Sequence, residues 1–255
     1  MIFYFSGTGI TRNFAREISS HLNDTAVDIV SALNNKQFNY TLNPGERLGF
    51  ASPVYFGRIP EIVIKFIQKL NIITADHYYA YIALTCHAIA GDSTRLLSHA
   101  LIKRGLTVNA AFVLKTVDTF LPLYPLPAPD RLQQLEQQTI EQTKFIAQQI
   151  EERTTGVQHK EQFKKISTLF MHPLYGLMRH TKFFSVSNQC TSCGICARHC
   201  PVGAIALSDA STKHPEWIKS KCLLCMRCLQ HCPQNAIDYG NLTQGKQRYK
   251  CPEPK

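Results

Sequence analysis

A cysteine pattern that occurs twice constrains this chain more than any other feature of its sequence. The run Cys-Thr-Ser-Cys-Gly-Ile-Cys-Ala-Arg-His-Cys-Pro at 190–201 aligns without gaps with Cys-Leu-Leu-Cys-Met-Arg-Cys-Leu-Gln-His-Cys-Pro at 222–233. Three cysteines spaced by two residues can wrap three corners of one iron–sulfur cube, because iron in such clusters prefers soft thiolate ligands. The fourth cysteine opens a segment that leads away, so we expect it to bind the other cluster.

This reasoning predicts two [4Fe–4S] clusters whose ligand sets cross between the two runs. The first set is Cys190, Cys193, Cys196 and Cys232, and the second set is Cys222, Cys225, Cys228 and Cys200. Two zinc sites or a disulfide scaffold are the alternatives. Zinc usually takes two Cys-x-x-Cys pairs and does not require a repeated fourth cysteine followed by proline. Metal-bound thiolates in a reducing compartment suit this spacing better than disulfides. Cys86 and Cys251 remain unassigned.

The cysteine region resembles bacterial-type two-cluster ferredoxins, which carry electrons. One difference is the 21-residue separation between Cys200 and Cys222, which is longer than in minimal ferredoxins. We expect this insertion, which includes residues 211–217, to form an enlarged hairpin. Trp217 within it is expected to shield a cluster or to contact a partner.

The first half of the chain alternates apolar, strand-like runs with amphipathic stretches. Such alternation indicates βαβ units and a parallel sheet with helices on both faces. The expected strands span 2–5, 26–30, 47–51, 78–85 and 107–114, and the expected helices span 11–21, 59–70, 92–105 and 130–153. Four prolines in 121–129 exclude a helix or a central strand there and indicate a surface loop.

A loop of small residues follows the first expected strand and opens the first expected helix. It consists of Ser6, Gly7, Thr8, Gly9, Ile10 and Thr11. Small residues let backbone N–H groups close around a phosphate, and the N-terminus of the helix favours the anion. A dinucleotide-binding fingerprint would need a third glycine where Arg12 stands, and a P-loop would need a Gly-Lys-Ser/Thr sequence that this loop lacks.

The loop resembles the phosphate loop of flavodoxins, whose ligand is FMN. Two later loops, after the third and fourth expected strands, are similar to flavodoxin loops that contact the flavin ring. The contacts that this resemblance implies in the two loops are Pro53, Val54, Tyr55, Phe56, Gly57, Thr85, Cys86, His87 and Gly91. The first and third strands flank the switch point of this topology, where its ligand is expected to bind.

Some of these residues also have a purely structural interpretation. Tyr55 and Phe56 compete for the role of the aromatic side chain that stacks on the flavin, and Tyr55 as a core residue is the alternative. Cys86 stands where a glycine is common in the family, and we favour a small buried side chain over a redox thiol. Arg58 is expected near the N1/C2 edge of the flavin, where its charge would raise the reduction potential.

Together, the two halves resemble flavodoxin–ferredoxin fusion proteins. The resemblance implies an α/β fold, a flavodoxin-like doubly wound parallel sheet in the order 2-1-3-4-5, followed by a small α+β ferredoxin domain with two [4Fe–4S] clusters. We expect the first domain at 1–155, a linker at 156–184 and the ferredoxin domain at 185–255. Packing of the aromatic linker on both domains is favoured over attachment to a membrane surface, because Pro173 and Gly176 interrupt any long helical face.

The resemblance implies electron transfer between bound FMN, the two clusters and external redox partner proteins. One alternative is an FMN-dependent reductase of a small molecule, supplied with electrons by the clusters; another is an iron–sulfur sensing or docking module. The sequence shows no recognisable acid–base pair and no nicotinamide motif for the reductase, and no helix-turn-helix candidate for the sensor. Whether the chain is an enzyme therefore stays open.

The formal net charge of +10 does not by itself indicate a nucleic-acid partner. Each cluster with its thiolates carries about −2 and a flavin phosphate about −2, which leaves the loaded protein at about +4. No apolar stretch reaches the ~18 residues that span a bilayer, and the N-terminus lacks the basic region of a secretory signal. We expect a cytoplasmic protein without stable membrane insertion.

Overall fold

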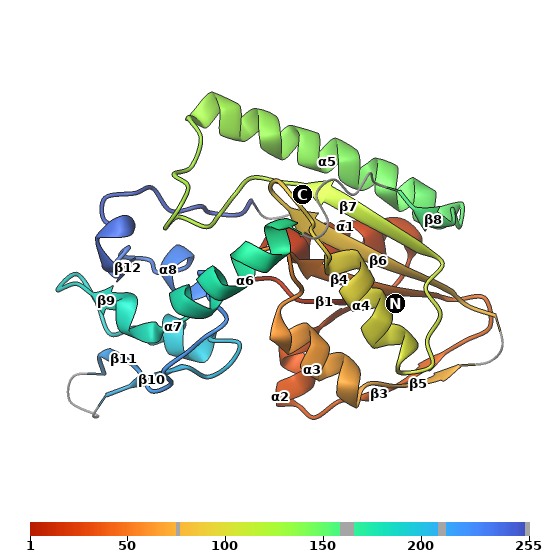
Figure 1. Ribbon diagram of the computed structural model, residues 1–255, viewed down its shortest axis with the longest axis horizontal. Coiled ribbons are helices and arrows are strands. Elements are labelled where there is room, and N and C mark those ends of the chain that lie inside the picture. The colour runs from red at the N-terminus through yellow and green to blue at the C-terminus, as the bar shows by residue number, and fades with distance from the viewer. Residues whose placement is uncertain (75–76, 159–165, 209–212, 253–255) are drawn as a thin grey trace.

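Two modules and a helix between them make up the molecule. The structure, a computed structural model, describes residues 1–74, 77–158, 166–208 and 213–252 (Figure 1). Residues 159–165 of the expected linker, and 211–212 of the expected hairpin, lie outside these ranges. We call residues 1–158, at the right of Figure 1, the sheet module, and residues 181–252, at the left, the cysteine module.

The sheet module is built on a six-stranded parallel sheet. Its strands, in spatial order, are β2 (Ala26–Asp28), β1 (Ile2–Tyr4), β4 (Arg47–Pro53), β6 (Tyr79–Cys86), β7 (Ala110–Lys115) and β8 (Gly156–Val157). The first five follow the expected order 2-1-3-4-5, because β3 (Asn39–Leu42) and β5 (Asn71–Thr74) pair only with each other in a small sheet of their own. The flavodoxin-like fold class is therefore confirmed. The two-residue strand β8 is an addition at the edge that the sequence did not indicate.

Helices cover both faces of this sheet, which explains why its central strands are continuous apolar runs. One face packs on α1 (Ile10–Leu22) and α5 (Pro129–Glu151), and the other on α2 (Ile29–Asn34), α3 (Glu61–Lys69) and α4 (Ser93–Ile102). Side chains alternate between the two faces along β1: Ile2 and Tyr4 join the first core, and Phe3 joins the second. The four expected helices match α1, α3, α4 and α5 within a few residues at each end.

The cysteine module is made of short elements. These are η1 (Thr181–Phe183), β9 (Phe184–Val186), α7 (Ile195–Arg198), β10 (Ile205–Leu207), β11 (Pro215–Trp217), α8 (Arg227–Gln230), β12 (Ile237–Tyr239) and η2 (Gly240–Leu242). Strands β10 and β11 pair antiparallel, so the described part of the long insertion forms the expected hairpin. Strand β9 pairs antiparallel with β12 and brings the start of the module to its end. The expected small α+β ferredoxin fold is confirmed.

Helix α6 (Ile166–Met178) lies between the modules, and the chain beyond η2 returns to the sheet module (Figure 1). On this return path Lys246 Nζ donates to Leu121 O at 2.7 Å, and Asn13 Nδ2 donates to Cys251 Sγ at 3.2 Å. The cysteine module is thus attached to the sheet module at both of its ends.

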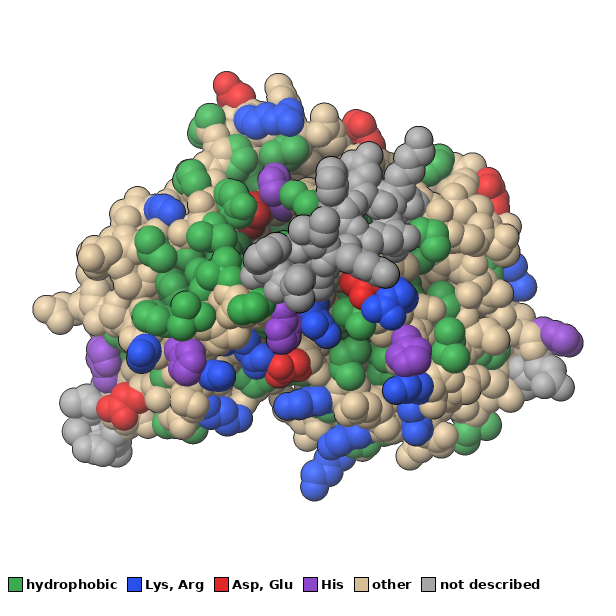
Figure 2. All heavy atoms as spheres, viewed as in Figure 1, with side chains coloured by type: hydrophobic (Ala, Val, Ile, Leu, Met, Phe, Trp, Pro, Cys, Tyr) green, Lys and Arg blue, Asp and Glu red, His purple; other side chains and the backbone are tan. Residues whose placement is uncertain are grey.

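Two further observations concern the charged side chains on the surface and the apolar character of the helices. On the face drawn in Figure 2, Lys and Arg side chains lie mainly along the lower part, on both modules, with Asp, Glu and His side chains among them. Within the described residues, no helix has the length and apolar character that crossing a membrane requires.

Candidate functional site

A cavity of about 360 Å³ opens at the carboxyl ends of β1, β4 and β6. We call it the switch-point cavity. The residues predicted from the three loops that line it are Ser6, Gly7, Thr8, Ile10, Thr11, Pro53, Val54, Tyr55, Phe56, Gly57, Thr85, Cys86 and His87. Two predicted residues, Gly9 and Gly91, do not line the cavity. Gly9 is the N-cap of α1, and Gly91 packs against Gly57, where a Cβ on Gly91 would lie 2.7 Å from Gly57 O.

Hydroxyl groups hold the first loop in shape. Ser6 Oγ accepts a hydrogen bond from Gly9 N at 3.0 Å, and Thr11 Oγ1 lies 2.7 Å from Thr85 Oγ1 in the third loop. Ile10 and Thr11 open α1 and line the cavity, so the positive end of the helix dipole faces this space. Small residues, hydroxyls and a helix N-terminus are the groups that hold a phosphate, and this loop fits the phosphate of FMN.

The two competing aromatic residues both line the cavity, but they face different neighbours. Tyr55 is half-buried, with its ring edge-on to Phe5 at 6.4 Å between centroids, and burial raises the pKa of its hydroxyl well above the ordinary value. Phe56 stacks on Tyr175 of α6 at 5.1 Å and meets Phe120 edge-on at 5.3 Å. Both rings could border a planar ligand, so the choice between them stays a prediction.

Arg58, unlike Tyr55 and Phe56, does not line the cavity. Its backbone closes a turn with Tyr55 through two hydrogen bonds, of 2.9 and 3.0 Å, and its side chain is not part of the cavity wall. The expectation that Arg58 faces the flavin therefore has no support from the geometry.

A fourth loop, which the sequence analysis missed, completes the sheet-module side of the cavity. It follows β7 and contributes Thr116, Val117, Asp118, Thr119 and Phe120. Thr119 Oγ1 lies 3.2 Å from Thr8 Oγ1, and Asp118 Oδ1 accepts a hydrogen bond from Phe120 N at 2.7 Å. The rule that ligands bind beyond the carboxyl ends of parallel strands would have found this loop, because it follows the fifth expected strand directly.

Cys86 and His87 line the cavity close to the start of this fourth loop. His87 Nδ1 lies 3.2 Å from Thr116 O, and Lys115 Nζ lies 3.7 Å from Cys86 Sγ. Burial raises the pKa of the Cys86 thiol, with Lys115 opposing the shift. A buried, protonated thiol agrees with the interpretation of Cys86 as a small core side chain.

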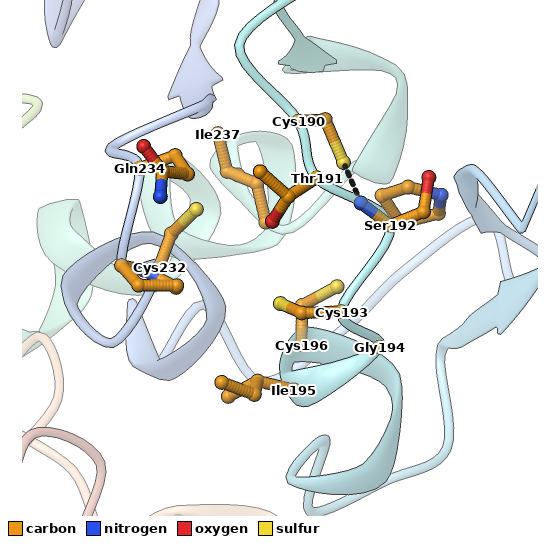
Figure 3. A pocket seen from close by; sticks show the side chains of 12 residues that line it. Cys190, Thr191, Ser192, Cys193, Gly194, Ile195, Cys196, Cys232, Gln234 and Ile237 are labelled. Atoms are coloured by element: carbon orange, nitrogen blue, oxygen red, sulfur yellow. Dashed lines mark hydrogen bonds between the residues drawn. The ribbon is translucent and has the colours of Figure 1, made fainter.

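The first predicted cysteine set surrounds one small cavity in the cysteine module. Cys190, Cys193, Cys196 and Cys232 line a space of about 20 Å³, which we call the first cysteine cavity. Figure 3 shows Cys190, Cys193 and Cys196 on one continuous segment that ends in α7, and Cys232, from the second run, beside the same space. Cys193 is exposed to solvent. The structure thus brings together four thiols from both runs, as a crossed ligand set requires.

The second predicted set surrounds a second space of about 20 Å³. This second cysteine cavity is lined by Cys200, Cys222, Cys225 and Cys228, together with Phe184 and Trp217. The rings of Phe184 and Trp217 are stacked 5.1 Å apart, so Trp217 shields this cavity with its neighbour. Burial raises the pKa of the Cys222 thiol to about 12 and also raises the pKa of the Cys225 and Cys228 thiols, so iron must displace their protons.

Backbone N–H groups point at cysteine sulfur atoms in the same way in both runs. Ser192 N donates to Cys190 Sγ at 3.4 Å, and Leu224 N donates to Cys222 Sγ at 3.3 Å. Ala204 and Ala236 repeat this pattern at Cys200 and Cys232, at 3.2 and 3.3 Å. Hydrogen bonds to sulfur stabilise thiolate ligands and tune cluster potentials. The donor chemistry and the crossed grouping both fit two [4Fe–4S] clusters.

Arg179, which follows α6, ties the second cysteine loop to the sheet module. Its Nε donates to Cys222 O at 2.6 Å, and its Nη1 and Nη2 bind Glu61 at the start of α3, at 2.5 and 2.9 Å. The guanidinium also lies 5.2 Å from the centroid of the Tyr175 ring. Hydrogen bonds from Arg179 lower the pKa of the Glu61 carboxyl. The junction between the modules therefore includes the polar contacts of Arg179 as well as apolar packing.

An Arg179→Ala variant is expected to unfold at a lower temperature than wild type. It leaves Cys222 O without its charged donor, a loss of about 1–3 kcal/mol. Glu61→Gln removes only the ion pair, whose acidic member is largely exposed, and should cost less than about 1 kcal/mol. Thermal unfolding of both variants checks this; equal losses would show that the contact with Cys222 O contributes nothing.

Comparisons with known proteins agree with the two-part architecture. A family model described as "Flavodoxin domain" matches residues 1–110, and one described as "4Fe-4S dicluster domain" matches residues 189–236. A search of curated proteins found no match.

Solved structures resemble the chain only distantly. A rubredoxin oxygen:oxidoreductase from Desulfovibrio gigas is 15% identical, with a TM-score of 0.35; the match covers 61% of this chain and 36% of that one. The Trp repressor binding protein of Bacillus subtilis is 12% identical at a TM-score of 0.35, with 56% of this chain and 96% of that chain covered. General stress protein 14 of Treponema denticola, solved in complex with FMN, is 9% identical at a TM-score of 0.35. That match covers 58% of this chain and 97% of that chain.

The two family matches cover separate stretches of the chain. The flavodoxin match begins at the first strand and contains the phosphate loop. The dicluster match contains all eight cysteines of the two crossed sets. The chain therefore carries a flavodoxin domain and a 4Fe-4S dicluster domain, the combination of flavodoxin–ferredoxin fusion proteins, and its cofactors are FMN and two [4Fe–4S] clusters.

Proposed function

We propose that this protein transfers electrons between its bound FMN, its two clusters and external redox partner proteins. A redox role follows from the two domains, and the step beyond it concerns how they work together. A flavin exchanges one or two electrons and each cluster exchanges one, so a chain that holds both can connect partners that handle electrons in pairs to partners that handle them singly.

One observation carries this proposal: the switch-point cavity and the second cysteine cavity share a wall. Cys225 and Met226 line both spaces. A single stretch of backbone therefore separates the proposed flavin site from one predicted ligand of the second cluster. Fixing two cofactors in one chain replaces diffusional encounter by a permanent short separation.

The first cysteine cavity is placed differently. None of its lining residues also lines the switch-point cavity, and Cys193 on its rim is exposed. We infer that the cluster held by Cys190, Cys193, Cys196 and Cys232 exchanges electrons with partner proteins, and that the cluster held by Cys200, Cys222, Cys225 and Cys228 connects it to the flavin. The surrounding residues hold the sulfur ligands and exclude water from the inner cavity.

Anaerobic purification with cofactor analysis and flash photoreduction tests the proposal. About eight irons and one FMN per chain are expected. After rapid one-electron reduction of the clusters, absorbance changes of the flavin should follow at a rate that does not depend on protein concentration. A rate proportional to concentration would mean that the cofactors communicate only between molecules. Absence of flavin, with no uptake of added FMN, would make the sheet module a docking module instead.

A further inference from the structure

The second cysteine loop differs from the first mainly in residues that do not bind iron. Where the first run has Thr191, Ser192, Gly194 and Ile195, the second has Leu223, Leu224, Met226 and Arg227. The backbone is nevertheless the same, because φ is 56° at Ser192 and 55° at Leu224, and 70° at Gly194 and 56° at Met226. The two loops thus wrap their cavities alike and present different surfaces to their surroundings.

Arg227 binds the phosphate loop directly. Its Nη2 donates to Ser6 O, its Nε donates to Gly7 O at 3.3 Å, and its Nη1 donates to His199 O at 3.1 Å. His199 precedes Cys200, which belongs to the same predicted ligand set as Cys225 and Cys228. One guanidinium therefore connects the phosphate loop to both segments that supply the second cluster.

Leu224 and Met226 make the apolar part of the contact between the second cysteine loop and the sheet module. Both are buried and belong to a cluster that includes Leu121, Tyr175 and Leu229, and both line the switch-point cavity. Met226 has no glycine-like freedom, yet it adopts the left-handed conformation that Gly194 has in the first run. This conformation is unfavourable for residues with large side chains, so it must be held by surrounding contacts and by ligation of the flanking cysteines.

We propose that the second cysteine loop is part of the FMN-binding site, so that loading of the second cluster strengthens FMN binding and loading of the first cluster does not. The inference rests on the proposed function, because it assumes that both sites are filled as described. Without iron, the loop loses the ligation that fixes residues 224–227, and the cavity loses one wall. By thermodynamic reciprocity, FMN must also favour retention of the second cluster.

The test compares two serine variants at the same position of the repeat. Cys222→Ser disturbs the second set and Cys190→Ser the first, and neither residue lines the switch-point cavity. Wild type and both variants are purified anaerobically, freed of flavin and titrated with FMN, with quenching of flavin fluorescence as the readout. Coupling of ordinary size predicts a dissociation constant about tenfold higher for Cys222→Ser and little changed for Cys190→Ser. Iron analysis, with about four irons per chain expected for each variant, establishes that each has lost one cluster.

A second variant keeps all cysteines and so does not depend on how the serine variants fold. Arg227→Ile places the residue of the first run in the second, and Arg227→Lys keeps the charge but not the fork of donors. Both should retain about eight irons. FMN should bind more weakly to Arg227→Ile than to wild type, and Arg227→Lys should recover only part of the affinity.

The possible outcomes distinguish failure of the proposed function from failure of the coupling between the second cluster and FMN. If wild type binds no FMN, the proposed function fails and this inference fails with it. If wild type binds FMN and Cys222→Ser and Arg227→Ile bind it equally well, the proposed function stands and the coupling does not exist. Equal weakening by Cys190→Ser and Cys222→Ser would also overturn the inference, because the effect would then not belong to the adjacent cluster.

Discussion

A Gly7→Ala variant is expected to be purified with little or no FMN and to unfold at a markedly lower temperature than wild type. The added Cβ would lie 2.5 Å from Tyr55 Oη and 2.6 Å from Cys225 O. The Tyr55 side chain could move, but Cys225 O belongs to a backbone segment that Arg227 holds against this same loop. Overpacking of this kind costs about 1–3 kcal/mol, occasionally more. Flavin content and thermal unfolding measure the two effects.

Gly176→Ala provides the matched control. Gly176 lies inside α6, and a Cβ there would meet no atom within 4 Å. Alanine in a helix interior is favoured over glycine by about 0.5–1 kcal/mol, so this variant should retain FMN and be slightly stabilised. If Gly7→Ala kept its flavin and unfolded like wild type, the close packing of the phosphate loop on the second cysteine loop would be refuted.

Removal of iron is expected to unfold the cysteine module while the sheet module remains folded. The α-helices of the cysteine module have four residues, and its strands and 3₁₀ helices have three. Its apolar cluster packs against the cysteine side chains themselves, among them Cys196, Cys222, Cys228 and Cys232. A module of such short elements is barely stable unless a metal site or disulfide holds it together. The free energy of metal binding therefore contributes directly to the folding of the module. The sheet module has two apolar cores of its own.

Limited proteolysis with and without an iron chelator tests this expectation under reducing conditions. Cleavage should begin within 185–252 after chelation, and residues 1–158 should stay protected. The cleavage sites would also examine the predicted boundaries at 155 and 185, which stay a prediction. Untreated protein incubated with the same protease serves as the reference, and an unchanged digestion pattern after complete loss of iron would contradict the prediction.

Local sequence patterns were sufficient for most of the sheet module. The strands were predictable because β1, β4, β6 and β7 are apolar runs, and one error shows the limit of that signal. Residues 26–30 were expected to be a strand, yet β2 ends at Asp28 and α2 begins at Ile29. Ile29 and Val30 favour strands, but Asp28 Oδ1 accepts hydrogen bonds from Val30 N and Ser31 N, at 2.7 and 3.3 Å, and caps a helix instead.

The candidate site was predictable only in part, for a different reason. Three of its loops could be found because each follows a strand and carries a recognisable pattern of small or aromatic residues. The fourth loop, after β7, was missed because it carries no such pattern. The wall from the cysteine module consists of Leu224, Cys225 and Met226, and no local sequence signal indicates that this cysteine run lines the switch-point cavity. Its position depends on Arg227, Arg179 and the packing of α6, which are tertiary contacts. Arg227 is accordingly an arginine at the phosphate loop that the sequence did not indicate. Among the arginines, only Arg58 had been expected near the flavin, at the N1/C2 edge of its ring.

The returning segment after η2 has a consequence for how the molecule assembles. Asn13 and Cys251 are in contact although 238 positions separate them, and Gln230 joins Thr119 O to Tyr249 N. Contacts between such distant residues form slowly, because closing a long loop costs entropy before the contact can offset it. During synthesis the sheet module can therefore fold alone, and the returning segment can close on α1 only after the cysteine module is complete. Iron delivery, rather than chain synthesis, is then expected to time the last folding step.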